Sequence, residues 1–249
     1  MRHHTIDLNC DLGEGFAHDA AIMPLISSAN IACGAHAGDS KTMRDTVALA
    51  QAHGVAIGAH PGFADREHFG RRELHLKRPA LEQLIIEQIA ALRELGELAH
   101  VKPHGALYNL AARDRQVAET FVGAVQWLDP ALMLFASSGS ELANVGREAG
   151  LRVVEEAFVD RTYQGDGTLT PRSDPRACIG FAPQAIAQAF RLIEHGEVEA
   201  LDGRRVTVRA ETLCLHGDHP GVLEFARELR AALAARHVEV RAPSAVQIS

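Results

Sequence analysis

Short apolar runs alternate along this chain with longer segments whose apolar residues recur at helical spacing. The clearest helical segment has Pro79 near its start, apolar residues on one face from Leu81 to Leu95, and Gly96 directly after it. Proline suits the first turn of a helix, and glycine suits the position just past its last turn. The pattern therefore predicts a helix between Pro79 and Leu95.

Seven short apolar runs are predicted strands, and each is followed by a predicted helix. The expected strands cover residues 5–10, 31–35, 55–59, 99–103, 131–136, 152–159 and 211–215. The expected helices cover about 19–28, 40–53, 79–95, 114–128, 140–149, 183–195 and 220–235. A polar hairpin joining 198–201 to 205–209, with its turn at Asp202 and Gly203, and a last strand at 237–240 complete the pattern. This alternation indicates a parallel sheet covered by helices.

Seven strand–helix units in series favour a closed or nearly closed barrel over an open sheet. GAHAG at 34–38 and GAHPG at 58–62 lie one strand–helix unit apart, which predicts equivalent positions on neighbouring strands. No GxGxxG follows the first strand, and the chain has no GxxxxGK[ST] motif, so the usual nucleotide-binding sheets are disfavoured. We expect an α/β fold in which residues 1–249 form a single-domain (β/α) barrel of about seven βα units.

Composition excludes several classes of protein. The 249 residues are 47% hydrophobic and 23% charged, with a formal net charge of −7, so the basic surface typical of nucleic-acid binders is not expected. No apolar run approaches the roughly 18 residues that span a bilayer, and no signal peptide is recognisable. The four cysteines form no CxxC pair, which favours a reducing compartment. We therefore expect a cytoplasmic protein that binds neither nucleic acid nor membrane.

Polar residues follow the alternation of the predicted strands. In the first strand Asp7, Asn9 and Asp11 share one face, while the apolar residues between them share the other, which must pack against helices. The polar face is thus predicted to line the barrel interior, where Asp7 fits a structural role, such as an ion pair with Lys102, as well as a catalytic one. The same alternation on the other strands predicts a set of side chains that point inward, with Glu14 at the rim. They are His36, His60, Lys102, His104, His216 and Asp218.

The carboxyl ends of barrel strands carry the active site in enzymes of this architecture, so these residues are expected to form one site. Glu156 shares the parity of Asp160 on the sixth strand, but its direction is ambiguous from sequence. The cysteines are expected to be small apolar fillers. The histidines expected in loops or at the surface are His53, His68, His75, His100, His195 and His237.

Two loops are expected at the rim of the barrel, beside the inward-facing polar residues, and two kinds of chemistry suit those residues. The loop at 62–72 carries Arg66, Arg71 and Arg72, which suit a carboxylate or phosphate ligand or a solvated basic loop equally well; the loop at 160–173 carries Tyr163 and Arg172 and could form a lid. One chemistry is a metal site with an open position for water. The other is metal-free hydrolysis with a carboxylate or histidine base and Lys102 as the electrophile. No sequence motif decides between them.

Segments along nearly the whole chain resemble the LamB/YcsF family, the A subunits of 5-oxoprolinase. The matching segments are IDLNCDLGEGF (6–16), NIACGAHAGD (30–39), GVAIGAHPGF (54–63), FGRR (69–72), VKPHGALYN (101–109), DRTYQGDGTLTPRS (160–173) and TLCLHGD (212–218). The family pattern after the third strand reads PGFxDxxGFGRR, and this chain departs from it with His68 in place of the glycine before Phe69.

The resemblance implies a barrel of the glycoside hydrolase/deacetylase type and ATP-dependent hydrolysis of 5-oxo-L-proline to L-glutamate. It implies ATP as co-substrate, expected with Mg²⁺, and two partner subunits, B and C; whether a transition metal is bound stays open, as does the subunit that binds ATP. On this hypothesis the catalytic candidates are Asp11, Glu14, His36, Lys102, His104 and His216. The substrate-binding candidates are Asp7, Asn9, His60, Arg71, Arg72, Tyr163, Arg172 and Asp218.

Within that hypothesis, Asp11, Glu14 or His36 would activate water, and Lys102 and the arginines would offset phosphate charge. His104 or His216 would protonate the departing nitrogen. Two alternatives stay open: a stand-alone metal-dependent deacetylase or carbohydrate hydrolase, which a stoichiometric transition metal would favour, and a non-catalytic substrate-binding subunit.

Overall fold

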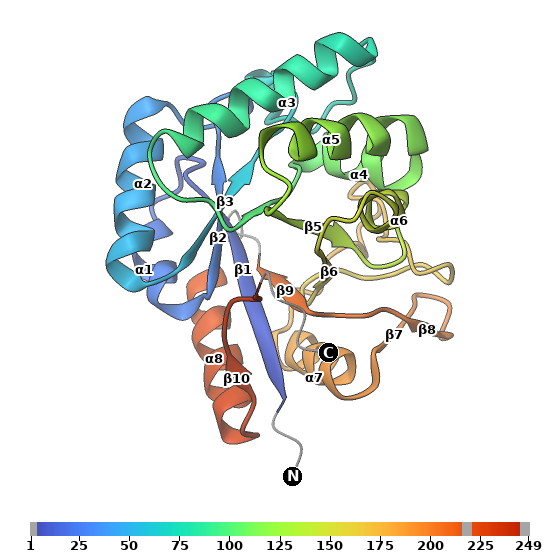
Figure 1. Ribbon diagram of the computed structural model, residues 1–249. Coiled ribbons are helices and arrows are strands. Elements are labelled where there is room, and N and C mark those ends of the chain that lie inside the picture. The colour runs from blue at the N-terminus through green and yellow to red at the C-terminus, as the bar shows by residue number, and fades with distance from the viewer. Residues whose placement is uncertain (1–3, 216–220, 245–249) are drawn as a thin grey trace.

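Seven parallel strands close into a barrel in the computed structural model, which describes residues 4–215 and 221–244 (Figure 1). The strands, in order around the barrel, are β1 (Thr5–Leu12), β2 (Ser28–Ala32), β3 (Ala56–His60), β4 (His100–Val101), β5 (Met133–Ser137), β6 (Val153–Phe158) and β9 (Thr212–Leu215). Strand β9 closes the barrel, because it pairs with both β6 and β1: its Thr212 lies opposite Glu156 of β6 on one side and Asp7 of β1 on the other. The predicted (β/α) barrel of seven units is confirmed.

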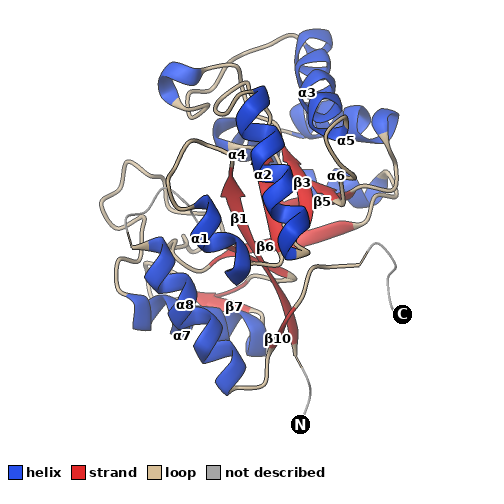
Figure 2. Cartoon of the chain, turned by 90° about the vertical axis from the view of Figure 1, so that its left-hand side faces the viewer, coloured by secondary structure: helices blue, strands red, loops and turns tan. Residues whose placement is uncertain are grey.

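Helices surround the barrel on the outside (Figure 2). They are α1 (Asp19–Ile22), α2 (Ser40–His53), α3 (Arg78–Arg93), α4 (Gly105–Arg113), α5 (Arg115–Leu128), α6 (Glu141–Glu148), α7 (Ala182–His195) and α8 (Val222–Ala235), with short 3-10 turns η1 (Met23–Leu25) and η2 (Arg66–His68). Local chemistry sets their ends. The Asp39 carboxylate accepts the backbone N–H of Thr42 at the start of α2, and Gly54 ends that helix with a left-handed φ of 65°.

Outside the barrel, two smaller pairings follow the sequence prediction. β7 (Glu197–Glu199) and β8 (Arg205–Thr207) form the expected antiparallel hairpin. β10 (Glu239–Val240) lies parallel to the first two residues of β1.

Several elements differ from the sequence prediction. The first helix was expected over about 19–28, but α1 ends at Ile22 and a 3-10 turn follows it, and the fourth strand is shorter than the expected 99–103. The second strand was expected at 31–35, but β2 begins at Ser28. The pattern of apolar residues missed this start because Ser28 and Asn30 are polar, although both point into the barrel and are fully buried. Helix α4 was not predicted. It occupies residues that the pattern left unassigned, directly before the predicted helix at 114–128. Asp114 separates the two helices, because it ends α4 and its carboxylate accepts two backbone N–H groups at the start of α5.

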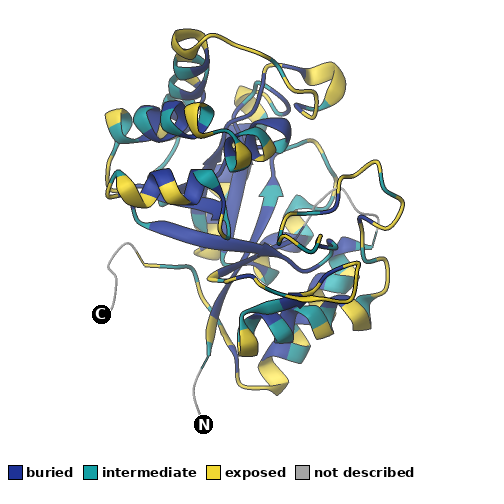
Figure 3. Ribbon diagram, turned by 90° about the vertical axis from the view of Figure 1, so that its right-hand side faces the viewer, coloured by how far each residue is buried: buried dark blue, intermediate teal, exposed yellow. Residues whose placement is uncertain are grey.

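The hydrophobic core lies between the barrel and its helices. Ile6, Leu8, Cys10 and Leu12 form the outward face of β1, and all are buried under the helices. Full burial of one such aliphatic side chain is worth about 1.5–3 kcal/mol, so this layer dominates stability. Figure 3 shows the strands buried and the outer faces of the helices exposed. Among the described residues no helix has the length and apolar character needed to cross a membrane.

Candidate active site

The floor of the barrel interior is a carboxylate surrounded by hydroxyls. Asp7 accepts hydrogen bonds from Ser27 Oγ at 2.6 Å and Ser28 Oγ at 2.8 Å on Oδ1, and from Thr212 Oγ1 on Oδ2. Burial raises the pKa of Asp7 to about 6, although the three hydroxyl donors act in the opposite direction. These three hydroxyls, rather than the ammonium of Lys102, surround the Asp7 carboxylate.

Above the floor, Asn9 joins four groups through its amide. Its Nδ2 donates to Glu156 Oε1 at 3.0 Å and to Thr212 Oγ1 at 2.7 Å. Its Oδ1 accepts from Asn30 Nδ2 at 2.7 Å and from Lys102 Nζ at 3.2 Å. The amide therefore uses both hydrogens and both acceptor positions, which fixes its orientation.

His100 belongs to this layer, so its expected place in a loop or at the surface is wrong. The ring is fully buried and stacks on Phe135 with centroids 4.0 Å apart, and its Nε2 lies 2.8 Å from Asn30 Oδ1. Burial lowers the pKa of His100 to about 3, so the ring is neutral and donates its Nε2 proton to that oxygen. Gly58 on β3 makes the space, because a Cβ there would lie 2.1 Å from His100 Nε2.

Lys102 carries the positive charge at the centre of the site. Its Nζ lies 2.7 Å from Glu156 Oε1 and 3.0 Å from Asp11 Oδ1, and its side chain is 3% exposed. Burial alone would disfavour the ammonium, but the two carboxylates outweigh it and the pKa of Lys102 is raised well above its ordinary value. The same Nζ also donates to Cys214 Sγ, whose thiol pKa is raised by burial, so this cysteine is a neutral partner.

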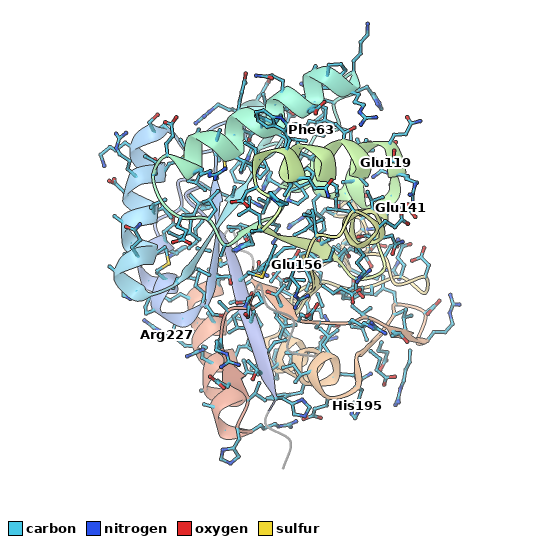
Figure 4. All side chains as sticks on the ribbon, in the orientation of Figure 1. Phe63, Glu119, Glu141, Glu156, His195 and Arg227 are labelled. Carbon is cyan, nitrogen blue, oxygen red and sulfur yellow. The ribbon has the colours of Figure 1, made fainter. Side chains whose placement is uncertain are left out.

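Glu156 resolves the ambiguity left by the sequence. Its side chain points inward near the centre of the molecule and is 1% exposed (Figure 4). Its Oε1 accepts hydrogen bonds from both Lys102 Nζ and Asn9 Nδ2. Glu156 is thus a member of the site that sequence parity alone did not assign.

Two histidines meet at the carboxyl ends of β3 and β4. His60 Nε2 lies 3.0 Å from His104 Nδ1. The other nitrogen of each ring faces a backbone oxygen: His60 Nδ1 lies 2.8 Å from Lys102 O, and His104 Nε2 lies 2.9 Å from Phe69 O. Desolvation, then the neighbouring His60, lowers the pKa of His104 to about 3.

The carboxylates of Asp11 and Glu14 flank this histidine pair. Asp11 Oδ2 lies 3.4 Å from His60 Nε2, and Glu14 Oε1 lies 3.4 Å from His104 Nδ1. Because Asp11 Oδ1 contacts Lys102, Asp11 links the central lysine to the histidines. The predicted convergence of the strand ends is therefore present, with two carboxylates, two imidazoles and one ammonium in contact.

His36 lies behind this group. Its ring is parallel to His104 with centroids 3.7 Å apart, and its Nε2 is 3.3 Å from Glu14 Oε1. Burial first, then His104 and His60, lower the pKa of His36 far below its usual range, so the ring is neutral. Gly62 and Gly70 pack against it so closely that an added Cβ would lie 2.8 Å from His36 in either case. His36 therefore orients Glu14.

A pocket of about 730 Å³ opens above the histidine pair. The sequence-predicted residues that line it are Asp11, Glu14, His60, Arg71, Lys102, His104 and Arg172. Tyr108, Ser137 and Arg161 also line the pocket and were not predicted; the short segment VKPHGALYN was the available signal for Tyr108. Predicted residues that the structure places outside the described lining are Asp7, Asn9, His36, Arg72 and Tyr163. His216 and Asp218 lie outside the described residues.

The segment after β6 forms one wall of this pocket. Arg161 is buried there, donating from Nε to Ala177 O at 3.1 Å and from Nη2 to Thr170 O at 2.6 Å. The hydroxyl of Tyr163 accepts the backbone N–H of Phe158 at 2.8 Å. These internal hydrogen bonds hold the wall in place, while Arg172 lies along the pocket.

Comparison with known proteins agrees with this arrangement. The model of the LamB/YcsF family matches residues 6–248. The chain belongs to the LamB/YcsF family. Two curated relatives are the 5-oxoprolinase A subunits of Erwinia tasmaniensis, 48% identical over 240 residues, and of Geobacillus kaustophilus, 48% identical over 248 residues. These alignments cover 94% of this chain and 98% of the first relative, and 96% and 97% for the second.

A solved protein of similar size has the same fold. The crystal structure of a lactam utilization protein from Thermus thermophilus matches with a TM-score of 0.91 and 46% identity. The match covers 96% of this LamB/YcsF chain and all of that one. The likeness in both sequence and backbone extends over the barrel and the segments that build the pocket.

Proposed function

We propose that this LamB/YcsF protein is the A subunit of an ATP-dependent 5-oxoprolinase, which opens 5-oxo-L-proline to L-glutamate together with subunits B and C. Its ATP is expected to be used with Mg²⁺. The observation that carries the proposal is the near-complete match to two curated 5-oxoprolinase A subunits, combined with a polar pocket built from the matching segments.

The charges around the pocket suit a small anionic lactam. Arg71 and Arg172 line it, and guanidinium groups bind carboxylate and phosphate oxygens in a fixed fork. The carboxylates of Asp11 and Glu14 lie at its inner end. We infer that the arginines bind the carboxylate of the substrate and its transferred phosphate, while the reacting amide faces the two acidic residues.

A five-membered lactam is a stable amide, so the reaction needs activation. Transfer of the γ-phosphoryl group of ATP to the amide oxygen releases ADP and makes the ring carbon more electrophilic. Water then adds to that carbon, with Asp11 or Glu14 accepting its proton. Since the pKa of His104 is lowered, we assign proton delivery to the departing nitrogen to the same carboxyl group rather than to His104. The C–N bond breaks, and a second water hydrolyses the acyl phosphate to L-glutamate and phosphate.

The decisive assay measures ATP-dependent formation of glutamate from 5-oxoproline by the chain alone and with subunits B and C. We expect turnover only in the complex and a loss of at least a hundredfold in the Asp11→Asn variant, because an amide cannot accept the proton. His195→Gln, an exposed change on α7, serves as the matched control. Normal glutamate production by a folded Asp11→Asn complex would reject the catalytic role and favour a subunit that only binds the substrate.

A metal-dependent hydrolase that acts alone is the second candidate. The observation that favours it is the set Asp11, Glu14, His60 and His104, each offering one ligand atom, with all four atoms within 4.8 Å of one another. Such an enzyme would need neither ATP nor partner subunits. Deacetylation of acetylated sugars by the isolated chain, with no glutamate formed by the complex, would support this reading over the first.

A further inference from the structure

The hydrogen-bond partners of His60 and His104 determine which ring nitrogens carry protons. His60 Nδ1 faces Lys102 O, and His104 Nε2 faces Phe69 O, at 2.8 and 2.9 Å. A carbonyl oxygen only accepts hydrogen bonds, so each of these nitrogens must carry the proton of its ring. In two neutral rings, His60 Nε2 and His104 Nδ1 then both present lone pairs, and these two atoms are only 3.0 Å apart.

Two facing lone pairs repel each other unless a hydrogen-bond donor or a cation lies between or beside them. The flanking groups increase this repulsion, because Asp11 Oδ2 and Glu14 Oε1 each lie 3.4 Å from one of the same two nitrogens. Carboxylate oxygens add negative charge and donate no proton when ionised. The four atoms thus converge as acceptors on one region of the pocket.

We propose that His60, His104, Asp11 and Glu14 form a binding site for one divalent transition-metal ion. Metal-ligating histidines commonly donate their other ring N–H to a backbone carbonyl or carboxylate, which fixes the ring orientation, and both rings here do so. This inference goes beyond lactam hydrolysis, because it rests on the ligand atoms alone.

The spacing of the atoms fits such an ion. Ligands about 2.1 Å from a metal lie about 3.0 Å apart at a right angle and about 3.4 Å apart at a tetrahedral angle. The separations of 3.0, 3.4 and 3.4 Å around His60 and His104 match these values. All four ligand atoms lie within 4.8 Å of one another. Two ligands about 2.1 Å from one ion are at most about 4.2 Å apart, so a side-chain shift of a few tenths of an ångström would bring all four into contact with a single ion.

The surrounding charges favour a dication. Asp11 and Glu14 place two carboxylates directly against the histidine pair, and the ammonium of Lys102 lies on the far side of Asp11, between it and Glu156. Two imidazole nitrogens with two carboxylate oxygens suit Zn²⁺, Mn²⁺, Fe²⁺ or Co²⁺ better than Mg²⁺ or Ca²⁺, which prefer oxygen ligands only. When bound, such an ion would polarise an oxygen ligand beside the two carboxylates.

The test measures occupancy rather than turnover, so it can fail while the glutamate assay succeeds. The full chain is stripped with a chelator and titrated with Zn²⁺ by calorimetry and with Co²⁺ by absorption spectroscopy. We expect one ion per chain and a Co²⁺ spectrum of nitrogen and oxygen coordination. His60→Gln and His104→Gln should each weaken binding by at least a hundredfold, whereas His195→Gln should leave it unchanged.

A readout on the unmodified protein keeps the test valid if either variant fails to fold. Histidine ¹⁵N NMR of the stripped chain, recorded before and after adding Zn²⁺, should show two ring nitrogens changing to metal-bound shifts. No binding, a thiolate-type Co²⁺ spectrum, or binding that survives both substitutions would overturn the proposal. A proton held between the two rings, unaffected by Zn²⁺, would overturn it as well and identify an imidazole–imidazolium pair instead.

Discussion

Replacing Lys102 by methionine tests the buried charge network most directly. The ammonium lies 2.7 Å from Glu156 and 3.0 Å from Asp11, and methionine has nearly the same length without a charge. Removing one partner of a buried ion pair costs about 3–5 kcal/mol, because a charge is left without its counter-ion. For a chain of this size, such a loss lowers the melting temperature by roughly 6–20 °C.

Urea unfolding followed by far-UV circular dichroism measures this loss. The matched control is Lys41→Met, because Lys41 pairs with Asp45 on the exposed face of α2, where we expect no measurable change. In the double variant Lys102→Met/Glu156→Gln one of the two carboxylates no longer needs a cation. The double variant should therefore lose less free energy of unfolding than the sum of the two single losses, by about 1–3 kcal/mol. If Lys102→Met unfolds at the same urea concentration as Lys41→Met, the electrostatic account of the site is wrong.

Three further predictions concern single positions. The pKa of Asp7 is raised from 3.8 to about 6, so its protonated form contributes stability that is full below pH 3.8 and is lost as pH rises through 6. The free energy of unfolding should therefore fall by about 2–3 kcal/mol between pH 4 and pH 7, and Asp7→Asn should abolish this fall in urea unfolding curves at the two pH values. Gly58→Ala should destabilise by about 1–3 kcal/mol, because the added methyl group meets the buried His100 ring, whereas Gly123→Ala in open space on α5 should stabilise in the same urea titration, by up to about 1 kcal/mol. Arg161→Met should release two backbone carbonyls of the pocket wall, and faster tryptic cleavage within 160–179 would show it; an unchanged cleavage rate would mean that other contacts hold the wall.

The alternation of β1 predicted the inner face of the barrel correctly. Asp7 and Asn9 are buried inside it, and Asp11 points the same way at its upper end, because period-two patterning leaves little freedom once the apolar face has helices to cover. The position of Lys102 and His104 after β4 followed from the same rule. The barrel architecture was equally predictable, since seven strand–helix units in series have few ways to bury their apolar faces.

Other members of the site depend on contacts between distant segments. Asn30 was not assigned to a strand, because a strand buried on both faces can carry polar side chains only when partners exist across the barrel. His100 is such a partner, and only the glycine opposite, Gly58, reveals in the sequence that a ring fits there. The direction of Glu156 required knowledge of where Lys102 lies, 54 positions earlier in the chain.

The fixed amide of Asn9 limits how this pocket can be redesigned. An aspartate there would turn two donors into acceptors that face Glu156 and Thr212, so a change at Asn9 calls for matching changes at its neighbours. The residues of the interior polar layer are therefore expected to vary together: libraries that change them one at a time should return mostly destabilised chains. New substrate preferences are more accessible through the rim at 62–72 and 160–173, where Arg71 and Arg172 border the pocket without belonging to that layer.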